Sequence, residues 1–138
     1  MKNLSISLFV ILAASFLFSS CAQTKVVVSK EQVQNKWMIL TIAGVANEKI
    51  SADAYIDLSN NAKSGAKAGC NQLFFSYELA AKNKIKFSDI GSTRMACPDM
   101  TTEDQLIKLF PFIDNVEIRN NMLVLKIGNR DAVTAKRA

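Results

Sequence analysis

The sequence predicts a small α+β domain in which an antiparallel sheet, rolled into a barrel-like shape, packs against one helix. Three observations support this prediction. Short segments with the alternation of strands occupy most of the chain, a single segment has helical spacing, and strands and helices do not alternate as they do around a parallel sheet. The N-terminal residues have a different character and predict a lipoprotein signal peptide in front of this domain.

The N-terminal segment carries one positive charge, at Lys2, before a nearly unbroken apolar run over residues 4–18. This run is shorter than the roughly 20 apolar residues that span a bilayer. Residues 17–21 read Leu-Phe-Ser-Ser-Cys and resemble a lipobox, in which the cysteine accepts the lipid. We therefore expect residues 1–20 to be a signal peptide and Cys21 to be lipidated. An ordinary secretory signal beside an incidental cysteine is the alternative.

The remaining chain suits one compact domain. We interpret residues 21–35 as a lipidated tether and residues 36–138 as the domain, although the valine run at 26–28 could instead form an edge strand. The net charge is +5, and the basic residues are scattered, so we expect no nucleic-acid partner. The expected partners are the membrane, through the lipid anchor, and an unidentified envelope protein or small ligand.

Histidine is absent from the whole chain. This absence excludes catalytic triads that need histidine, histidine metal ligands and histidine general bases. The sequence also shows no paired-carboxylate or metal-ligand constellation. We therefore expect a protein that is not an enzyme, with no catalytic residues, no metal and no cofactor.

The strands are expected in order along the chain. Residues 37–42 form a continuous apolar run, which predicts a strand buried on both faces, and residues 54–58 alternate between an apolar and a polar face. Asn60, Asn61 and Gly65 then indicate a turn. Later strands are expected at residues 73–79, 84–87, 116–119 and 122–127, with a last short one at 132–136, which makes about seven in all.

Two details of these later strands carry predictions. Asn120 and Asn121 separate two alternating segments, and their tolerance of positive φ suits a two-residue hairpin turn. In the segment 73–79, alternation places Phe75 on the same face as Tyr77.

One segment has helical spacing. Thr102 is followed three places later by Gln105, with Glu103 and Asp104 between them, which predicts a hydroxyl cap and acids facing the helix dipole. Pro111 ends the helix after about nine residues. The expected apolar face consists of Leu106, Leu109 and Phe110.

Three cysteines are present. With Cys21 committed to lipid, Cys70 and Cys97 remain as a pair in an oxidising compartment. Their separation matches neither a CxxC redox motif nor a zinc site. We expect a structural disulfide between them, and two reduced, buried thiols are the alternative.

Three landmarks occur in order along the chain. They are Trp37-Met38-Ile39-Leu40 followed by Gly44; Gly65, then Gly69-Cys70-Asn71 and Tyr77; and Thr93-Arg94-Met95-Ala96-Cys97-Pro98 leading into the helix. Over about residues 36–128, this pattern resembles the META domain, the HslJ-like family of heat-inducible bacterial lipoproteins. The resemblance implies a compact domain of antiparallel strands with one helix, anchored in the cell envelope and associated with stress and drug tolerance. It implies no catalytic residues.

Four landmark residues are candidate binding residues: Arg94, Trp37, Asn71 and Tyr77. Arg94 adjoins the expected crosslink, where it could contact an anion or a partner, or lower the pKa of a free thiol. Trp37 and Asn71 also have structural interpretations, as a core anchor and a turn residue. Gly65 and Gly69 are expected to mark bulges or positive-φ positions. Where the family tends to have glycine, this chain has Phe75, which is expected to fill interior space.

The expected function is therefore that of a non-catalytic, lipid-anchored lipoprotein of the outer membrane that faces the periplasm. Its interaction with envelope components in the stress response is expected from the resemblance alone. One alternative is a carrier or sensor of an apolar or anionic ligand, which a pocket lined by Trp37, Phe75 and Tyr77 would favour. The other is a thiol-based redox sensor, which requires an exposed Cys97 with a depressed pKa.

Overall fold

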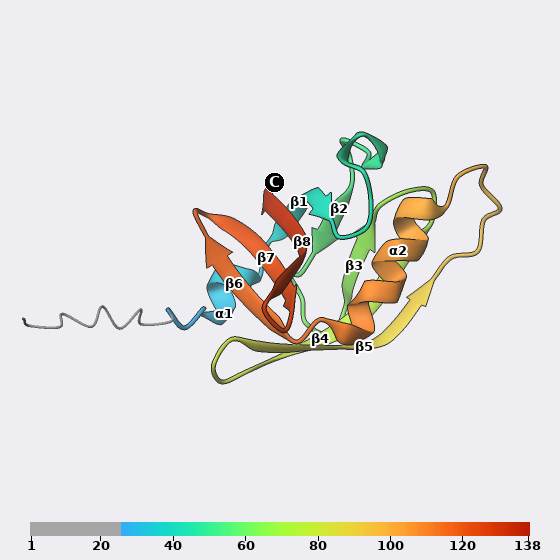
Figure 1. Ribbon diagram of the computed structural model, residues 1–138. Helices are drawn as coiled ribbons and strands as arrows, with labels where there is room; N and C mark the ends of the chain where they lie inside the picture. Colours follow the sequence, from blue (N-terminus) through green and yellow to red (C-terminus); the bar gives the residue numbers. More distant parts are fainter. Residues whose placement is uncertain (1–25) are drawn as a thin grey trace, which may run out of the picture.

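The computed structural model describes residues 26–138, so the expected signal peptide (residues 1–20) and Cys21 lie outside the described residues (Figure 1). In the described part, eight antiparallel strands follow one another, and the first also pairs with the last. The strands are β1 (Lys36–Ile42), β2 (Tyr55–Asp57), β3 (Ser64–Lys67), β4 (Gln72–Ala80), β5 (Lys84–Ser92), β6 (Asn115–Arg119), β7 (Met122–Ile127) and β8 (Arg130–Arg137). The helices are α1 (Lys30–Val33), α2 (Thr101–Leu109) and the 3-10 turns η1 (Asn47–Lys49) and η2 (Phe110–Phe112).

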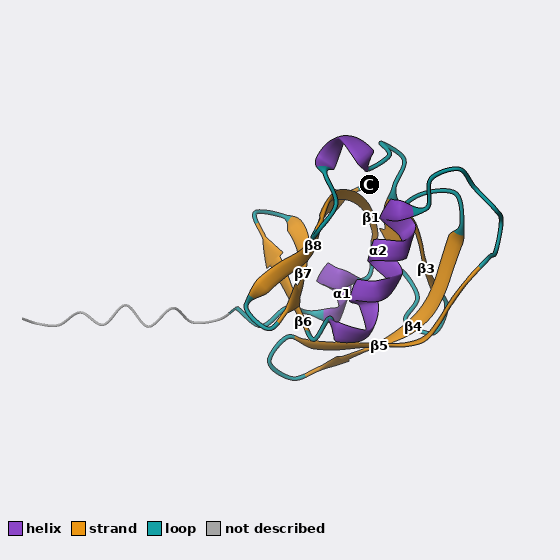
Figure 2. Ribbon diagram, turned by 45° about the vertical axis from the view of Figure 1, so that its right-hand side comes forward, coloured by secondary structure: helices purple, strands orange, loops and turns teal. Residues whose placement is uncertain are grey.

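The sheet closes into an uneven ring. β4 and β5 pair over most of their length, whereas β5 and β6 pair only at Lys84 and Asn115. Next to this thin seam, η2 packs against β5, and α2 lies across the ring (Figure 2). The result is a ring-like antiparallel sheet with one packed helix rather than a regular barrel. This architecture confirms the predicted fold class.

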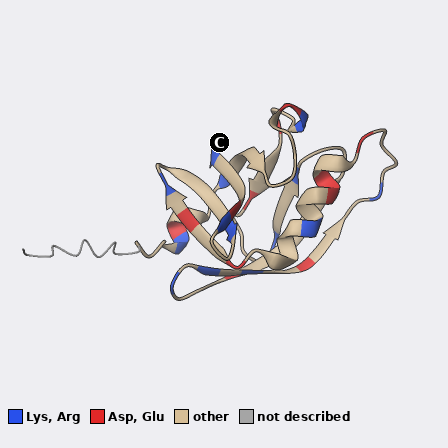
Figure 3. Cartoon of the chain, viewed as in Figure 1, with Lys and Arg blue, Asp and Glu red and all other residues tan. Residues whose placement is uncertain are grey.

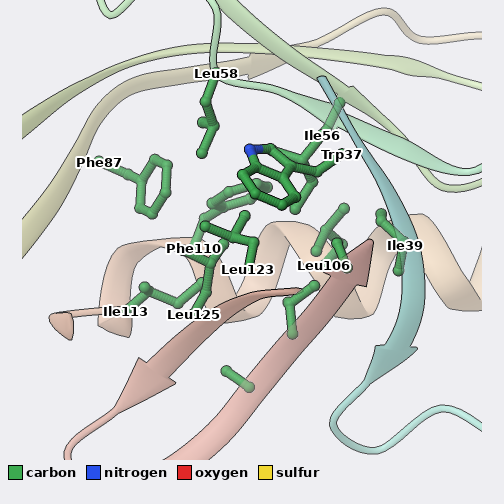
Figure 4. Close-up of a cluster of buried hydrophobic side chains, with 14 of the residues drawn as sticks. Trp37, Ile39, Ile56, Leu58, Phe87, Leu106, Phe110, Ile113, Leu123 and Leu125 are labelled. Atoms are coloured by element: carbon green, nitrogen blue, oxygen red, sulfur yellow. The ribbon is translucent and has the colours of Figure 1, made fainter. Parts of the chain in front are cut away.

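The core lies between α2 and the inner face of the ring (Figure 4). Phe110 is fully buried there, and its ring centroid lies 4.7 Å from that of Phe75 and 4.8 Å from that of Phe87. Leu106 is also fully buried, which confirms the main part of the predicted helical face. Trp37 fills the opposite side of the same core.

The folded domain includes residues that the sequence analysis placed in the tether. Val33, at the end of α1, is fully buried, and its carbonyl accepts a 2.9 Å hydrogen bond from the Trp37 indole. The valine run 26–28 forms no strand, because the amide of Val28 donates to the side chain of Asn83 instead of to a neighbouring backbone. The domain therefore begins earlier than residue 36, and the edge strand is not formed.

The prediction that β1 is buried on both faces is wrong. Trp37 and Ile39 point inward, whereas Leu40 is 38% exposed. The pairing of β1 with β8 shifts between Ile39 and Thr41, so a bulge brings Ile42 back to the inner face. The long apolar run therefore reflects a bulged strand with one buried face, and its two remaining apolar residues, Met38 and Leu40, are half-buried and exposed, respectively.

One strand was not predicted. Gly65, expected in a turn, lies in β3, where it pairs with Asp57 on one side and Phe74 on the other. The turn itself is confirmed at Asn60, whose side chain accepts from the amides of Ala62 and Lys63. β3 is short and built from small residues and lysine, so its sequence carries no alternating apolar signal.

The helix has the predicted length of nine residues but not the predicted cap. No side chain caps it at Met100, and Asp99 accepts from the Thr101 amide. The Thr102 hydroxyl donates to Lys49 O at 3.3 Å, and the Gln105 amide group donates to Ala43 O at 2.9 Å. These side chains therefore attach α2 to the connection after β1.

The β6–β7 hairpin is confirmed at its turn. Asn120 and Asn121 have φ values of +51° and +62°, and Arg119 pairs with Met122 on either side of them. Among the described residues, no helix is long and apolar enough to cross a membrane.

Candidate functional site

Residues from two of the sequence landmarks meet around the first turn of α2. The connection from β3 to β4 supplies Gly69 and Asn71, the segment after β5 supplies Thr93 and Met95, and α2 supplies Glu103. We refer to these five residues as the Asn71–Glu103 cluster. It is the place where the family-specific residues could form a site, so its geometry decides what they do.

Glu103 is a buried acid, with 1% of its surface exposed. One carboxylate oxygen accepts the backbone amide of Asn71 at 2.7 Å, and the other accepts the Asn71 side-chain amide at 2.6 Å. No lysine or arginine in residues 26–138 forms an ion pair with it. Its place in the first turn of α2 adds the favourable field of the helix N-terminus. The acid therefore fastens the helix to the sheet.

Asn71 is also buried, and its amide group is fully used. Besides Glu103, its Nδ2 donates to Met95 O at 3.2 Å. Its Oδ1 accepts from the Thr93 hydroxyl at 2.8 Å and from the Met95 amide at 2.7 Å. A side-chain amide offers two donor hydrogens and two acceptor lone pairs, and all four are engaged here. Asn71 therefore holds three chain segments together and has no free group for a ligand.

Gly69 is required by close approach rather than by backbone conformation. A Cβ atom at this position would lie 2.9 Å from a carboxylate oxygen of Glu103. The expectation that Gly65 and Gly69 mark bulges or positive-φ positions is wrong. The described positive-φ glycines are Gly44 and Gly128, Gly65 pairs in β3 without a register shift, and Gly69 lies outside the strands. Gly69 leaves the space into which the carboxylate fits.

Cys70 and Cys97 form a disulfide, with their Cα atoms 6.4 Å apart. The bond lies beside Asn71 and joins two of the three segments that Asn71 holds together. The alternative of two reduced thiols is therefore wrong for this structure. With both sulfur atoms bonded, there is no free thiol whose pKa Arg94 could lower, which removes the observation that the redox-sensor alternative needs.

The other candidate binding residues are not gathered at this cluster. Trp37 and Tyr77 are buried in the core, so they are anchors rather than ligand contacts. The Tyr77 hydroxyl donates to Leu58 O at 2.8 Å, and burial raises the pKa of this phenol. Arg94 is exposed on the segment after β5 and makes no ion pair within the described residues.

The interior position of Phe75 is confirmed. Its side chain is buried, and its ring centroid lies 5.2 Å from that of Phe87 in an edge-on arrangement. The ligand-carrier alternative needs a pocket between Trp37, Phe75 and Tyr77, but this space is occupied by these side chains themselves, which belong to one buried cluster. This filling counts against the ligand-carrier alternative.

Hollows do occur on the outer surface. One groove of about 510 Å³ lies between the segment that contains Val27, the β4–β5 turn and the β7–β8 turn. A second groove, of about 360 Å³, lies beside Phe112. The two share Lys84 and Asp114 in their walls. No group of three or more acidic or cysteine side chains with metal-binding geometry occurs among the described residues.

The family model of the META domain matches residues 30–138. This chain belongs to the META domain family. The match begins at α1, in agreement with the buried position of Val33 in this META domain. No curated protein sequence matches the chain significantly.

Two solved structures share the fold of this META domain. The NMR structure of a protein from Burkholderia xenovorans is 25% identical, with a TM-score of 0.60 over 78% of this chain and 84% of that chain. A second NMR structure is 16% identical, with a TM-score of 0.61 over 80% of this chain and 95% of that chain. At this identity the second similarity establishes the fold alone.

Sequence reasoning identified the landmarks of the META domain but missed how they act. Glu103 was assigned to the helix dipole, whereas it is the central acceptor of the Asn71–Glu103 cluster. Two features of the sequence pointed toward this contact. Gly69 stands next to Cys70 and Asn71, and Glu103 has no lysine or arginine on its own face of the helix. These features do not indicate which acid approaches the glycine.

Proposed function

We propose that this META domain protein is a non-catalytic lipoprotein, anchored through Cys21, that interacts with other components of the cell envelope in stress tolerance. One observation carries the non-catalytic part. Asn71, which belongs to one of the landmarks, and Glu103 of the adjoining helix are buried and hydrogen-bonded to each other. Groups engaged in this way stabilise the fold and are unavailable to bind or activate a substrate.

The lipid anchor is supported by the N-terminal sequence. Residues 17–21 resemble a lipobox, and they follow a charged start and a short apolar run. Stable anchoring requires more than one acyl chain, since a single chain binds membranes only marginally. The mature chain would begin Cys21-Ala22-Gln23, without an acidic residue next to the cysteine, and we place it in the outer membrane facing the periplasm.

The anchor is tested by Cys21→Ser in the full chain. The variant is expected to lose acylation and to remain uncleaved or leave the detergent phase, as measured by mass spectrometry and detergent partitioning. Ser20→Ala is the matched control, because it keeps a small residue before the cysteine and should be lipidated normally. A Cys21→Ser protein that is still acylated and still partitions into detergent contradicts the proposal.

The absence of catalysis is tested separately. The purified protein is incubated with envelope metabolites, and products are sought by mass spectrometry. We expect no turnover. Reproducible turnover that disappears when Glu103 or another acid is replaced, in a variant that remains folded by circular dichroism, contradicts a non-catalytic role.

The interaction with envelope components is tested by crosslinking in intact cells. The wild-type chain should give crosslinked species that the Cys21→Ser chain, expressed to the same level, does not give. Survival under heat and envelope stress should fall when the gene is deleted and should recover with the wild-type chain. Normal survival of the deletion strain contradicts the stress role.

A further inference from the structure

The three most exposed large apolar residues of the described chain lie along two adjoining grooves. Val26, Val27 and Phe112 are 77%, 68% and 67% exposed. Val27 lines one of the two grooves described above, and Phe112 lines the other, and these grooves adjoin at the Lys84–Asp114 ion pair. Because isolated apolar residues are common on surfaces but clusters are not, this grouping indicates a contact surface.

The N-terminal segment is fixed to this region by one side chain. Asn83, in the β4–β5 turn, accepts from the Val28 amide at 2.7 Å and donates to the Val26 carbonyl at 2.9 Å. These two hydrogen bonds to Asn83 fix the backbone around the exposed valines. The valines are held beside the tip of the β4–β5 hairpin (Figure 1).

Lysines of one hairpin line both grooves. Lys82, Lys84 and Lys86 are all exposed along the β4–β5 hairpin, whose basic colouring is visible in Figure 3. Lys84 pairs with Asp114 at 3.0 Å, whereas Lys82 and Lys86 form no ion pair within the described part of the chain. Glu78 lies opposite Lys86 in the sheet register and offsets part of its charge. The three lysines therefore leave the region with a modest excess of positive charge.

The length of chain between the expected anchor and this region is short. Val26 lies five positions after Cys21 in the sequence, with four residues between them. Even a fully extended segment of this length spans at most about 17 Å. A chain anchored at Cys21 would therefore hold Val26 close to the bilayer surface.

We propose that the patch formed by Val26, Val27, Phe112, Lys82, Lys84 and Lys86 lies on the anionic phospholipid surface that carries the protein's own anchor. This inference rests on the proposed lipid anchor. The apolar side chains enter the boundary between headgroups and acyl chains, and the lysine ammonium groups lie among the phosphates. The domain is thereby oriented with the β4–β5 hairpin toward the membrane, in addition to being tethered.

The test uses the full lipidated chain in vesicles of phosphatidylcholine and phosphatidylglycerol at a ratio of 7:3. The reporter is Phe112→Trp, because the native Trp37 is buried and gives a constant background. The matched control is Phe74→Trp, at another exposed aromatic position. Phe74 lies six residues before Ala80, the last residue of β4, so it is about 20 Å along the strand from the end that leads into the β4–β5 turn. Brominated lipid is expected to quench Phe112→Trp at least twofold more strongly than Phe74→Trp.

A charge-reversal variant tests the lysines. Lys82→Glu combined with Lys86→Glu should reduce the quenching of Phe112→Trp at least twofold in the anionic vesicles, while flotation with the vesicles is unchanged. Val27→Trp serves as a second reporter if Phe112→Trp alters the near-ultraviolet circular dichroism. If the protein floats but the reporters at positions 112 and 74 are quenched equally, membrane contact by the patch is contradicted and the lipid anchor is not. If the protein does not float, both the anchor and the membrane contact are contradicted. Crosslinking of the patch to another protein, without quenching by lipid, also contradicts the membrane contact.

Discussion

Glu103 illustrates what a buried acid requires when no lysine or arginine of residues 26–138 pairs with it. Taking a carboxylate out of water is costly unless its lone pairs are engaged. Here two N–H groups of one residue, Asn71, engage both oxygens, and the N-terminus of α2 provides a favourable field. The absence of a side chain at Gly69 allows the carboxylate to approach the backbone. The three residues therefore depend on one another.

Gly69→Ala tests this dependence. The added methyl group would lie 2.9 Å from the Glu103 carboxylate and force it to move, so we expect a loss of about 1–3 kcal/mol in the free energy of unfolding. The loss is measured by urea denaturation of the oxidised protein.

The control for Gly69→Ala is the same substitution in a Glu103→Ala background. With the carboxylate removed, the methyl group has space, and the additional loss should be much smaller than in the wild-type background. An equal loss in both backgrounds would show that Gly69 is required for another reason.

Prediction at single residues succeeded where strand alternation alone decides the outcome. Phe75 was placed correctly in the interior because side chains in a strand alternate between faces. Glu103 was placed correctly in the first turn of the helix, but its hydrogen bond to Asn71 was missed because Asn71 lies 32 residues earlier in the chain. The position of Glu103 at the start of a helix already accounts for an acidic residue there, so the sequence offered no reason to look for a distant partner.

The β6–β7 hairpin is an element whose turn the sequence predicted in detail. Both turn residues, Asn120 and Asn121, adopt positive φ, a conformation that asparagine tolerates and glycine adopts without cost. Asn121→Gly should therefore raise the free energy of unfolding by about 0.5 kcal/mol, as measured by thermal and urea denaturation. The matched variant Asn121→Ala should lower it. Asn121→Gly with reduced stability would indicate a role for the asparagine side chain.

The same hairpin and β8 carry a charge network with a predictable pH dependence. Lys126 and then Arg119 lower the pKa of Glu117 below its usual value, through contacts of 2.9 and 2.7 Å. A lowered pKa stabilises the folded state above the unfolded-state value of about 4.3, and this contribution disappears as the pH falls through the folded-state pKa. The network is partly exposed, so the contribution is about 0.5–1 kcal/mol.

Glu117→Gln should accordingly melt at a lower temperature than the wild type at pH 7. The difference should shrink below about pH 4 and vanish near pH 2, as followed by circular dichroism. Glu48→Gln, at an exposed site in η1, is the control and should leave the melting temperature unchanged at both pH values. A difference at pH 2 as large as that at pH 7 would contradict an electrostatic origin.

At the scale of elements, prediction failed where pairing rather than composition defines the strand. β3 has only four residues and no large apolar side chain, and it exists because β2 and β4 pair with it from both sides. β1 has a misleading apolar run because a bulge between Ile39 and Thr41 changes which residues face inward. The sequence of one segment alone does not predict which strands pair with it or where a bulge interrupts the pairing.

The disulfide affects the stability of the whole molecule. It closes a loop with a sequence separation of 27 residues and joins the β3–β4 connection to the segment leading into α2. The chain-entropy account gives a stabilisation of about 3.5 kcal/mol for a loop of this length. A single domain is stable by about 5–15 kcal/mol, so Cys97→Ala should lower the melting temperature strongly, as measured by calorimetry.

Reduction of the wild type provides the control. The reduced wild type and Cys97→Ala should melt at similar temperatures, and peptide mapping without reductant should recover the Cys70–Cys97 linked peptide from the oxidised protein. An oxidised wild type that melts at the same temperature as Cys97→Ala would contradict a stabilising role for the bond.

The pairing of β1 with β8 has a consequence for the order in which the molecule can be completed. The two strands that close the ring are the first and the last in the chain, and the β5–β6 seam alone cannot replace them because it is a single residue pair. A nascent chain that lacks residues 130–137 therefore has two open sheet edges, and contacts so distant in sequence form slowly. The ring closes only after synthesis of β8, so completion of the sheet is the last step available to the growing chain.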